Sequence, residues 1–301
     1  MSRLLILLLT LFVSALSFAQ DRFANVEITS TKINDHLYML QGSGGNIMIS
    51  VGDDGVLMID DQFAPLSEKI MSKIKEISGG EGVSYLINTH WHGDHTGGNE
   101  NFGKAGATII AQHNVRKRMA RGKTKIEAGR EIPPAPAVAL PVITFGDDMK
   151  IHLNGDDIHL FHFHAGHTDG DGIIYFPEDN VVHMGDTFFN LRYPYVDLKS
   201  GGDVDGLLKT VGEVLFMIDD ETVIIPGHGS IASKADLVKY RSIIFELRDK
   251  VDMMVKQGKT LEEIQASGFS KEYDEVMGSG FINPERFAEI LYGSLTKESE
   301  E

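Results

Sequence analysis

The stretch NTHWHGDHTGGNE, residues 88–100, constrains this chain more than any other, because it crowds three histidines and an aspartate into six consecutive positions. The residues before it, VSYLIN, have the pattern of a β-strand, so His90 and His92 leave that strand on the same face. Gly93 permits a sharp turn, which lets Asp94–His95 point to a neighbouring position. Zinc favours nitrogen and carboxylate ligands where thiolates are absent. The stretch therefore predicts half of a metal site at a strand end.

Two metal ions need more than four ligands, and the second half of the chain offers three further candidates. His167 in AGHTDGD, Asp186 in HMGDTFF and His228 in PGHG each stand where a predicted strand gives way to a loop. Glycines adjoin all three, and glycine permits unusual backbone angles and close approach of chain segments. One such residue alone is weak evidence. Four strand ends from both halves that finish in imidazole or carboxylate together indicate a metal centre.

Short β-rich runs alternate with helical patterns along the whole chain. Strand patterns cover residues 36–42, 46–52, 55–61, 83–90, 107–112 and 222–229, and hairpins are predicted over 149–168 and 172–189. Helical patterns cover residues 65–78, 113–120 and 203–218, and three more helices open with Ser233 and Asp236, with Thr260 and Glu263, and with Asn283 and Pro284. Periodicity by itself indicates an α/β fold in one domain. The proline-rich stretch 122–141 is predicted to be a loop within that domain.

The first 19 residues have the layout of a secretory signal peptide. Arg3 precedes the apolar run Leu4–Val13, and small residues stand before a cleavage position between Ala19 and Gln20. Spanning a membrane takes about 20 apolar residues, roughly twice the length of this run. We therefore expect a cleaved leader and one mature domain of residues 20–301, periplasmic or secreted and without a membrane span.

Composition narrows the classes of protein that fit. The net charge of −16 argues against nucleic acid as a partner. The chain has no cysteine, so an exported protein of this sequence would form no disulfide and would depend on its core, with a metal as a further source of stability.

The motifs HWHGDH, GHTDGD, GDTFF and PGHG, in this order and at these separations, resemble the metallo-β-lactamase superfamily of hydrolases. The resemblance implies a four-layer αββα sandwich of two mixed β-sheets, with a dinuclear site that binds two Zn²⁺ or other divalent ions. One ion would take His90, His92 and His167, the other would take Asp94, His95 and His228, and Asp186 would bridge both. Asp60, which ends VLMID, matches an aspartate that orients a ligand histidine.

The resemblance implies a zinc-dependent hydrolase that opens an amide- or ester-type acyl bond of a small molecule, as a β-lactamase does. A metal-bound hydroxide would attack the carbonyl, and Asp94 would orient it. The lack of cysteine excludes the β-lactamases with a cysteine ligand, and an aspartate bridge is more like glyoxalase II or the acyl-homoserine lactonases. A lactonase or (thio)esterase is therefore the alternative. A non-catalytic zinc-binding protein and a metal-dependent oxidoreductase are rivals from other classes, but related iron oxidoreductases have Glu where His92 stands.

Substrate contacts are predicted in FFNLRYPY, residues 188–195, because this aromatic stretch directly follows a metal ligand. Arg192, Tyr193 and Tyr195 are the candidates, and Arg192, with Arg130 of the proline-rich loop, could bind a substrate carboxylate. A core role is the alternative for such a stretch. His159, His162 and His164 alternate with apolar residues and fit a half-buried strand better than a third metal site. The remaining histidines, His36, His113, His152 and His183, have no converging partners in the sequence pattern.

Overall fold

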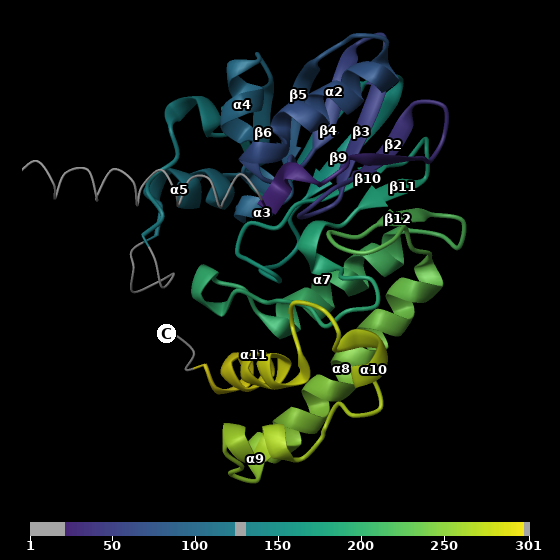
Figure 1. Cartoon of the computed structure of the whole chain (residues 1–301). Helices are drawn as coiled ribbons and strands as arrows, with labels where there is room; N and C mark the ends of the chain where they lie inside the picture. Colours follow the sequence, from purple (N-terminus) through teal and green to yellow (C-terminus); the bar gives the residue numbers. More distant parts are fainter. Residues whose placement is uncertain (1–21, 124–130, 298–301) are drawn as a thin grey trace, which may run out of the picture.

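The computed structural model describes residues 22–123 and 131–297, which form two β-sheets packed face to face with helices outside (Figure 1). The first sheet has seven strands in the order β1-β2-β3-β4-β5-β6-β7. They are β1 Thr29–Lys32, β2 Leu37–Gln41, β3 Ile47–Gly52, β4 Gly55–Ile59, β5 Val83–Asn88, β6 Thr108–Gln112 and β7 Ile143–Phe145. The second sheet has five, in the order β12-β11-β10-β9-β8. They are β8 Asp148–Leu153, β9 Asp156–Phe161, β10 Ile173–Phe176, β11 Val181–His183 and β12 Val223–Ile225.

Both sheets are mixed. In the first, β1 to β4 are antiparallel and β4 to β7 are parallel. In the second, β8 to β11 are antiparallel, and β11 pairs parallel with β12. Parallel neighbours end at the same sheet edge, so β4 and β5 deliver their following residues together, as do β11 and β12. This arrangement positions the metal centre.

The helices begin close to where their start signals predict. Ser233 with Asp236 and Thr260 with Glu263 form capping boxes, and Asn283 caps a helix whose first residue is Pro284. The helices and 3₁₀ turns are η1 Ala64–Leu66, α2 Ser67–Ser78, α3 Gly93–Thr96, α4 Asn99–Lys104, α5 His113–Arg121, η2 Ala137–Ala139, η3 Gly185–Thr187, η4 Leu198–Ser200, α7 Val204–Met217, α8 Lys234–Lys256, α9 Leu261–Ala266, α10 Asp274–Met277 and α11 Pro284–Thr296.

Three apolar cores separate four layers. Ile70 and Ile74 of α2 pack with Leu86 of β5 on the outer face of the first sheet. Leu57 and other inward residues of the first sheet meet those of β8 to β12 between the sheets. The outer face of the second sheet packs against α7, α8 and α11, for instance through Val211. The predicted αββα sandwich of two mixed sheets is confirmed.

Two predicted segments are described only in part or not at all. The predicted leader, residues 1–19, lies outside the described residues. Of the loop 122–141, the structure describes residues 122–123 and 131–141, and Lys123 pairs with Ile132 in an isolated bridge. Arg130 lies outside the described residues. Among the described residues, no helix combines the length and the apolar character that crossing a membrane requires.

Candidate metal centre

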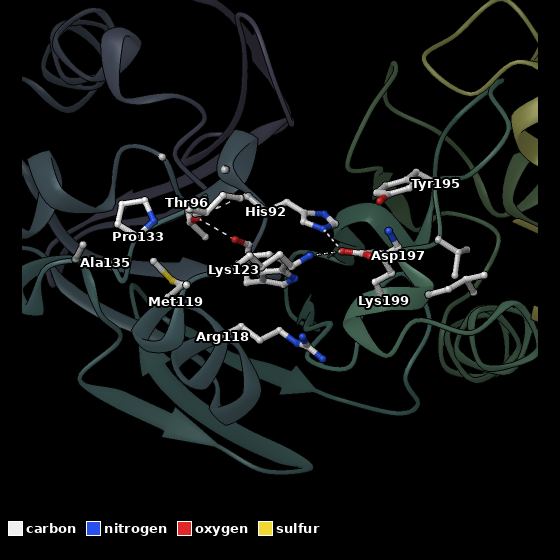
Figure 2. A pocket seen from close by; sticks show the side chains of 18 of the residues that line it. His92, Thr96, Arg118, Met119, Lys123, Pro133, Ala135, Tyr195, Asp197 and Lys199 are labelled. Carbon is white, nitrogen blue, oxygen red and sulfur yellow. Dashed lines mark hydrogen bonds and ion pairs between the residues drawn. The ribbon is translucent and has the colours of Figure 1, made fainter. Parts of the chain in front are cut away.

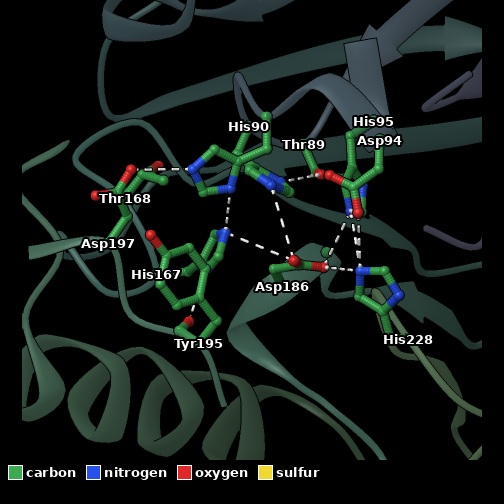
Figure 3. A network of polar contacts seen from close by, with 12 residues as sticks. Thr89, His90, Asp94, His95, His167, Thr168, Asp186, Tyr195, Asp197 and His228 are labelled. Atoms are coloured by element: carbon green, nitrogen blue, oxygen red, sulfur yellow. Dashed lines mark hydrogen bonds and ion pairs between the residues drawn. The ribbon is translucent and has the colours of Figure 1, made fainter. Parts of the chain in front are cut away.

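Strand ends at one edge of the sandwich bring together all seven predicted ligands (Figure 3). His90 and His92 follow β5, and the one-turn helix α3 carries Asp94 and His95. The other three come from the second sheet: His167 from the β9–β10 connection, Asp186 from η3 directly after β11, and His228 from the turn after β12.

Close packing of backbone segments allows these strand ends to meet. Gly185 has a φ of 49°, a left-handed conformation that glycine adopts without a Cβ penalty. A Cβ at Gly227 would collide with Asp186 Oδ1, so the PGHG turn needs glycine before His228. Asp60 also has a positive φ, of 60°, a strained conformation for a residue with a side chain.

The seven residues form two groups, in each of which the ligand atoms lie within 4.8 Å of one another. We call His90, His92 and His167 the three-histidine group, and Asp94, His95 and His228 the aspartate group. Asp186 faces both with different oxygens. Its Oδ2 lies 3.5 Å from His167 Nε2 and 3.9 Å from His90 Nε2. Its Oδ1 lies 3.2 Å from His95 Nε2 and 3.4 Å from His228 Nε2. This is the geometry that a bridging carboxylate requires.

Hydrogen bonds behind the three-histidine group fix which ring nitrogens carry protons. His92 Nε2 donates to Asp197 Oδ2 at 3.1 Å, and His167 Nδ1 donates to the Tyr195 carbonyl oxygen at 2.6 Å. The opposite nitrogens, His92 Nδ1 and His167 Nε2, then hold lone pairs and face each other at 2.8 Å. His90 Nε2 is buried and has no hydrogen-bond partner. Lone pairs that converge without a proton between them fit a bound cation.

Asp60 supports both groups from the buried side. Its Oδ2 accepts from His95 Nδ1 at 2.7 Å, so Nε2 is the ring nitrogen of His95 that faces Asp186. The same oxygen accepts from the Thr89 hydroxyl at 2.8 Å, and that hydroxyl accepts from His90 Nδ1 at 3.0 Å. Asp60 is therefore placed as expected for orienting His95, and through Thr89 it also orients His90.

Burial and neighbouring charges shift the pKa values of the histidines in the two groups in opposite directions. Burial lowers the pKa of His167 to about 4 and lowers that of His90 well below its usual value. Burial acts in the same direction on His228, but Asp186 and Asp94 outweigh it and raise the pKa to about 9. For Asp94, burial is outweighed by His95 and His228, which hold the pKa at about 2. Without a metal, protons on the aspartate group neutralise the carboxylates; a cation would replace them.

Among the described residues, the ligand side chains are exposed on one side of the centre. The side chains of His92, His228 and Asp94 are 16%, 18% and 28% exposed, whereas those of His95 and His167 are fully buried. A substrate must therefore approach along the three exposed residues.

A cavity of about 850 Å³ adjoins this open side at His92 (Figure 2). Its walls combine apolar residues such as Trp91 and Met119 with the charged residues Lys123 and Asp197. Tyr195 lines the same cavity, and its ring centroid lies 5.8 Å from that of His92 and 5.7 Å from that of His167. Burial and Asp197 raise the pKa of the Tyr195 hydroxyl to about 12, so it stays a hydrogen-bond donor at neutral pH. Tyr195 thus lies on the cavity wall beside two of the predicted ligands, and its role as a substrate contact stays a prediction.

The other two predicted contacts are placed differently. Tyr193 was predicted to contact the substrate, but its side chain is buried instead. It is 1% exposed, stacks on Phe287 of α11 and donates a hydrogen bond to Asp274 at 2.9 Å. The core alternative holds for this residue because the C-terminal helices cover it. Arg192 is exposed and lies beside Gly280, and it is absent from the described residues that line the cavity.

Asp197 and Lys123 are parts of the site that the motifs did not reveal. Asp197 holds His92, and Lys123 Nζ lies 3.1 Å from Asp197 Oδ2. The one sequence signal was that Asp197 follows the aromatic stretch 188–195 by two residues, where a polar support for a ligand could have been sought. Lys123 stands in the irregular loop and offered no signal.

Several of the remaining histidines have structural partners, among them His36, His152, His162 and His183. No third group of possible metal ligands occurs among residues 22–123 and 131–297, so the described residues give His159, His162 and His164 no metal site. His162 donates to the Asp171 carbonyl oxygen, and His183 donates to that of Asn46.

An αββα sandwich whose sheet edges gather imidazoles and carboxylates into two adjoining groups defines a metal-binding class of protein. Residues 38–232 match the family described as the metallo-beta-lactamase superfamily, about two thirds of the chain. The chain belongs to this superfamily, and the resemblance seen in its motifs is confirmed.

Curated relatives include two kinds of enzyme. A hydroxyacylglutathione hydrolase from Polaromonas sp. is 28% identical over 187 residues, which cover 62% of each chain. One from Nitrosococcus oceani is 28% identical over 148 residues, 48% of each chain. The chain thus matches less than two thirds of the length of these hydrolases. Metallo-beta-lactamase type 2 from Bacteroides fragilis is 21% identical over 238 residues, 76% of this chain and 90% of that protein.

Solved structures share the fold. The metallo-beta-lactamase from Pontibacter korlensis gives a TM-score of 0.59 at 18% identity, covering 72% of this chain and 99% of the other. The sec-alkylsulfatase Pisa1 from Pseudomonas sp. gives 0.67 at 18% identity, covering 88% of this chain and 50% of the other. The same fold is thus found with different named activities, so substrate must be argued from the site.

Proposed function

We propose that this protein is a dinuclear zinc hydrolase that opens an acyl bond of a small molecule. The observation that carries the proposal is Asp186, whose two oxygens face the two ligand groups separately. His90, His92 and His167 would hold one zinc, and Asp94, His95 and His228 the other. Zinc bound by these residues would polarise a carbonyl and would lower the pKa of a coordinated water to about 7.

The residues on the open side have distinct roles in this proposal. Asp94 is a carboxylate at neutral pH because its pKa is held at about 2. It can therefore accept a hydrogen bond from the attacking water and orient it, as a catalytic residue. The Tyr195 hydroxyl can donate a hydrogen bond to the substrate from the cavity wall. Buried His95 and His167 keep solvent from the inner side.

Among acyl substrates, an ester or thioester is favoured over a β-lactam. A carboxylate, Asp186, lies between the two groups, and a carboxylate bridge resembles that of glyoxalase II and the acyl-homoserine lactonases. The hydroxyacylglutathione hydrolase from Polaromonas sp. also has a higher identity, 28%, than the metallo-beta-lactamase from Bacteroides fragilis, 21%. A β-lactam-like cyclic amide is the second candidate, supported by the longer alignment with the latter, 238 residues against 187.

A substrate panel tests the proposal. Zinc-loaded protein is assayed with a glutathione thioester, a homoserine lactone, nitrocefin and a phosphodiester, each beside the Asp94→Asn variant. Turnover of the thioester or lactone, lost in Asp94→Asn, supports an acyl hydrolase, and nitrocefin turnover alone would favour the second candidate. Metal analysis that returns fewer than two zincs per chain after zinc addition would contradict the dinuclear site.

The cellular location of the protein is inferred from the leader pattern alone. We propose cleavage between Ala19 and Gln20 and a periplasmic or secreted mature protein. Edman or mass-spectrometric determination of the N-terminus of protein from a fractionated culture checks this. Soluble cytoplasmic protein that retains Met1 would contradict it.

A further inference from the structure

Asp197, the carboxylate that accepts from His92, also contacts a cation, Lys123. Asp60, the buried carboxylate that accepts from His95, has no such contact among the described residues. Asp197 Oδ2 accepts from His92 Nε2 and from Lys123 Nζ, both at 3.1 Å, and also from the Ser200 hydroxyl (Figures 2 and 3). One carboxylate oxygen is thus shared among three donors. This sharing links Lys123 to the three-histidine group.

Lys123 is fixed in this position. Its ammonium donates to the Ser200 hydroxyl at 2.8 Å and lies 4.2 Å from the centre of the Trp91 ring, and its side chain is 13% exposed. A cation this well enclosed is screened little by solvent. Its charge therefore acts on Asp197 and, through it, on His92.

Asp197 does not need Lys123 to stay in place. Its Oδ1 accepts from the Ser200 backbone N–H at 3.2 Å, and its own N–H donates to the His167 carbonyl oxygen at 2.9 Å. Its carbonyl oxygen accepts from the Gly202 N–H at 3.0 Å. Loss of the lysine would consequently change the charge on Asp197 Oδ2 more than its position.

The buried support shows what the lysine adds. Asp60 accepts from the Thr89 N–H at 2.8 Å, from the Thr89 hydroxyl and from His95. Within the described part of the chain, none of these donors to Asp60 comes from a lysine or arginine side chain. A carboxylate without a competing ammonium accepts more strongly from its imidazole and makes the opposite nitrogen a better metal ligand. Because Asp197 is shared with Lys123, His92 should bind a metal more weakly than it would if Asp197 accepted from His92 without the lysine.

We propose that Lys123 is a positioning residue that acts through Asp197 to weaken the hold of His92 on the metal of the three-histidine group. A metal held less tightly keeps more of its positive charge for polarising a substrate carbonyl. The proposal rests on the zinc site of the proposed function. It predicts that removing the lysine and removing the carboxylate charge of Asp197 change the zinc affinity in opposite directions.

Zinc affinity of the three-histidine group provides the test, measured by competition with a chromophoric chelator in a His228→Ala background that cripples the aspartate group. Lys123→Met keeps the side chain's length and its packing on Trp91 but removes the charge. It should tighten zinc binding by about threefold to tenfold. Asp197→Asn should weaken it by about 10- to 100-fold. Lys123→Arg should restore the parental affinity.

Lys117→Met is the matched control, because Lys117 is an exposed lysine of α5. It should leave the affinity unchanged, which separates a local effect from a change in net charge. A merely structural role of Lys123 would weaken zinc binding in Lys123→Met, and that outcome, or an unchanged affinity, overturns the inference. Failure of the unmodified protein to bind zinc at all would overturn the proposed function itself.

Discussion

The two halves of the metal centre are supported by the same device in different surroundings. In the aspartate group, Asp60 holds His95 from inside the sandwich, where both side chains are fully buried. In the three-histidine group, Asp197 holds His92 at the wall of the cavity, beside the cation Lys123. A carboxylate that orients a histidine can be sealed in a core when neutral donors surround it. Placed beside a cavity, it can also be adjusted by a charged neighbour.

The two groups differ in protonation as well. Burial keeps His90 and His167 neutral, so the three-histidine group presents lone pairs over a wide pH range. The carboxylates around His95 and His228 outweigh burial and favour their charged forms. One group is therefore ready to take a metal, and the other must first release protons.

The largest expected effect on zinc content and stability comes from substitution of Asp60, the buried carboxylate that holds His95. Asp60→Asn would present an amide N–H to His95 Nδ1 or lose the bond, and either change turns the proton of His95 toward the metal. We expect loss of zinc from the aspartate group and destabilisation by about 3–5 kcal/mol, the usual cost of breaking a buried charged network. Zinc content by mass spectrometry and the thermal midpoint measure the two effects.

Asp61→Asn is the control for that variant. Asp61 is equally buried, accepts from the Gly98 N–H at 2.8 Å, and burial raises its pKa well above the usual value, so an amide replaces it with little electrostatic change. It should keep both zincs. If Asp60→Asn and Asp61→Asn behave alike, Asp60 has no special role at the metal.

The second prediction uses pH. In metal-free protein the pKa of His228 is about 9, so below that pH each zinc that binds the aspartate group must displace a proton. Its affinity should fall about tenfold per pH unit for each proton displaced. The pKa of His167 is about 4, so the three-histidine group should hold zinc until much lower pH.

A zinc-sensitive dye added while the pH is lowered from about 8 to about 3 measures this difference. We expect two separate release steps, the first from the aspartate group and absent in His228→Ala. Release of both ions in a single step would mean that Asp186 couples the groups too strongly for their protonation to differ.

Much of the site could be predicted from the sequence because its ligands lie in short motifs at strand ends. The HWHGDH stretch places four ligands within six residues, and a strand's alternation alone aligns His90 with His92. The parallel pairing of β4 with β5 then brings Asp60 beside His95, as the resemblance implied.

The supports at the cavity could not be predicted in the same way. His92 and Asp197 are 105 positions apart, and Asp197 and Lys123 are 74 apart, so no local pattern connects them. Tyr193 was misplaced for a similar reason. Its neighbours in sequence resemble those of Tyr195, but its N–H bonds the Met277 carbonyl oxygen at 3.1 Å and the C-terminal helices cover it. Burial of this kind depends on tertiary packing, which periodicity in one stretch does not report.

The smallest expected effects are changes in KM when the residues predicted to contact the substrate are substituted. Tyr195→Ala removes a ring that lies against His92 and His167, but it keeps the backbone carbonyl that accepts from His167 Nδ1. Zinc content should therefore stay the same, while the KM for the best substrate of the panel rises about threefold to tenfold through lost contact area and a lost hydrogen bond. Tyr195→Phe, which loses only the hydroxyl, should show the smaller part of that rise.

Arg192→Ala completes the comparison, because Arg192 was predicted to bind a substrate carboxylate yet lies beside Gly280, away from the described cavity lining. It should change KM less than Tyr195→Ala for both a neutral ester and a carboxylate-bearing substrate such as nitrocefin. A larger rise for Arg192→Ala, confined to the carboxylate-bearing substrate, would restore carboxylate recognition by this residue. The substrate would then approach from the side of Arg192 and Gly280 and not along the cavity at His92, and the three-histidine group would no longer be the side that meets the substrate.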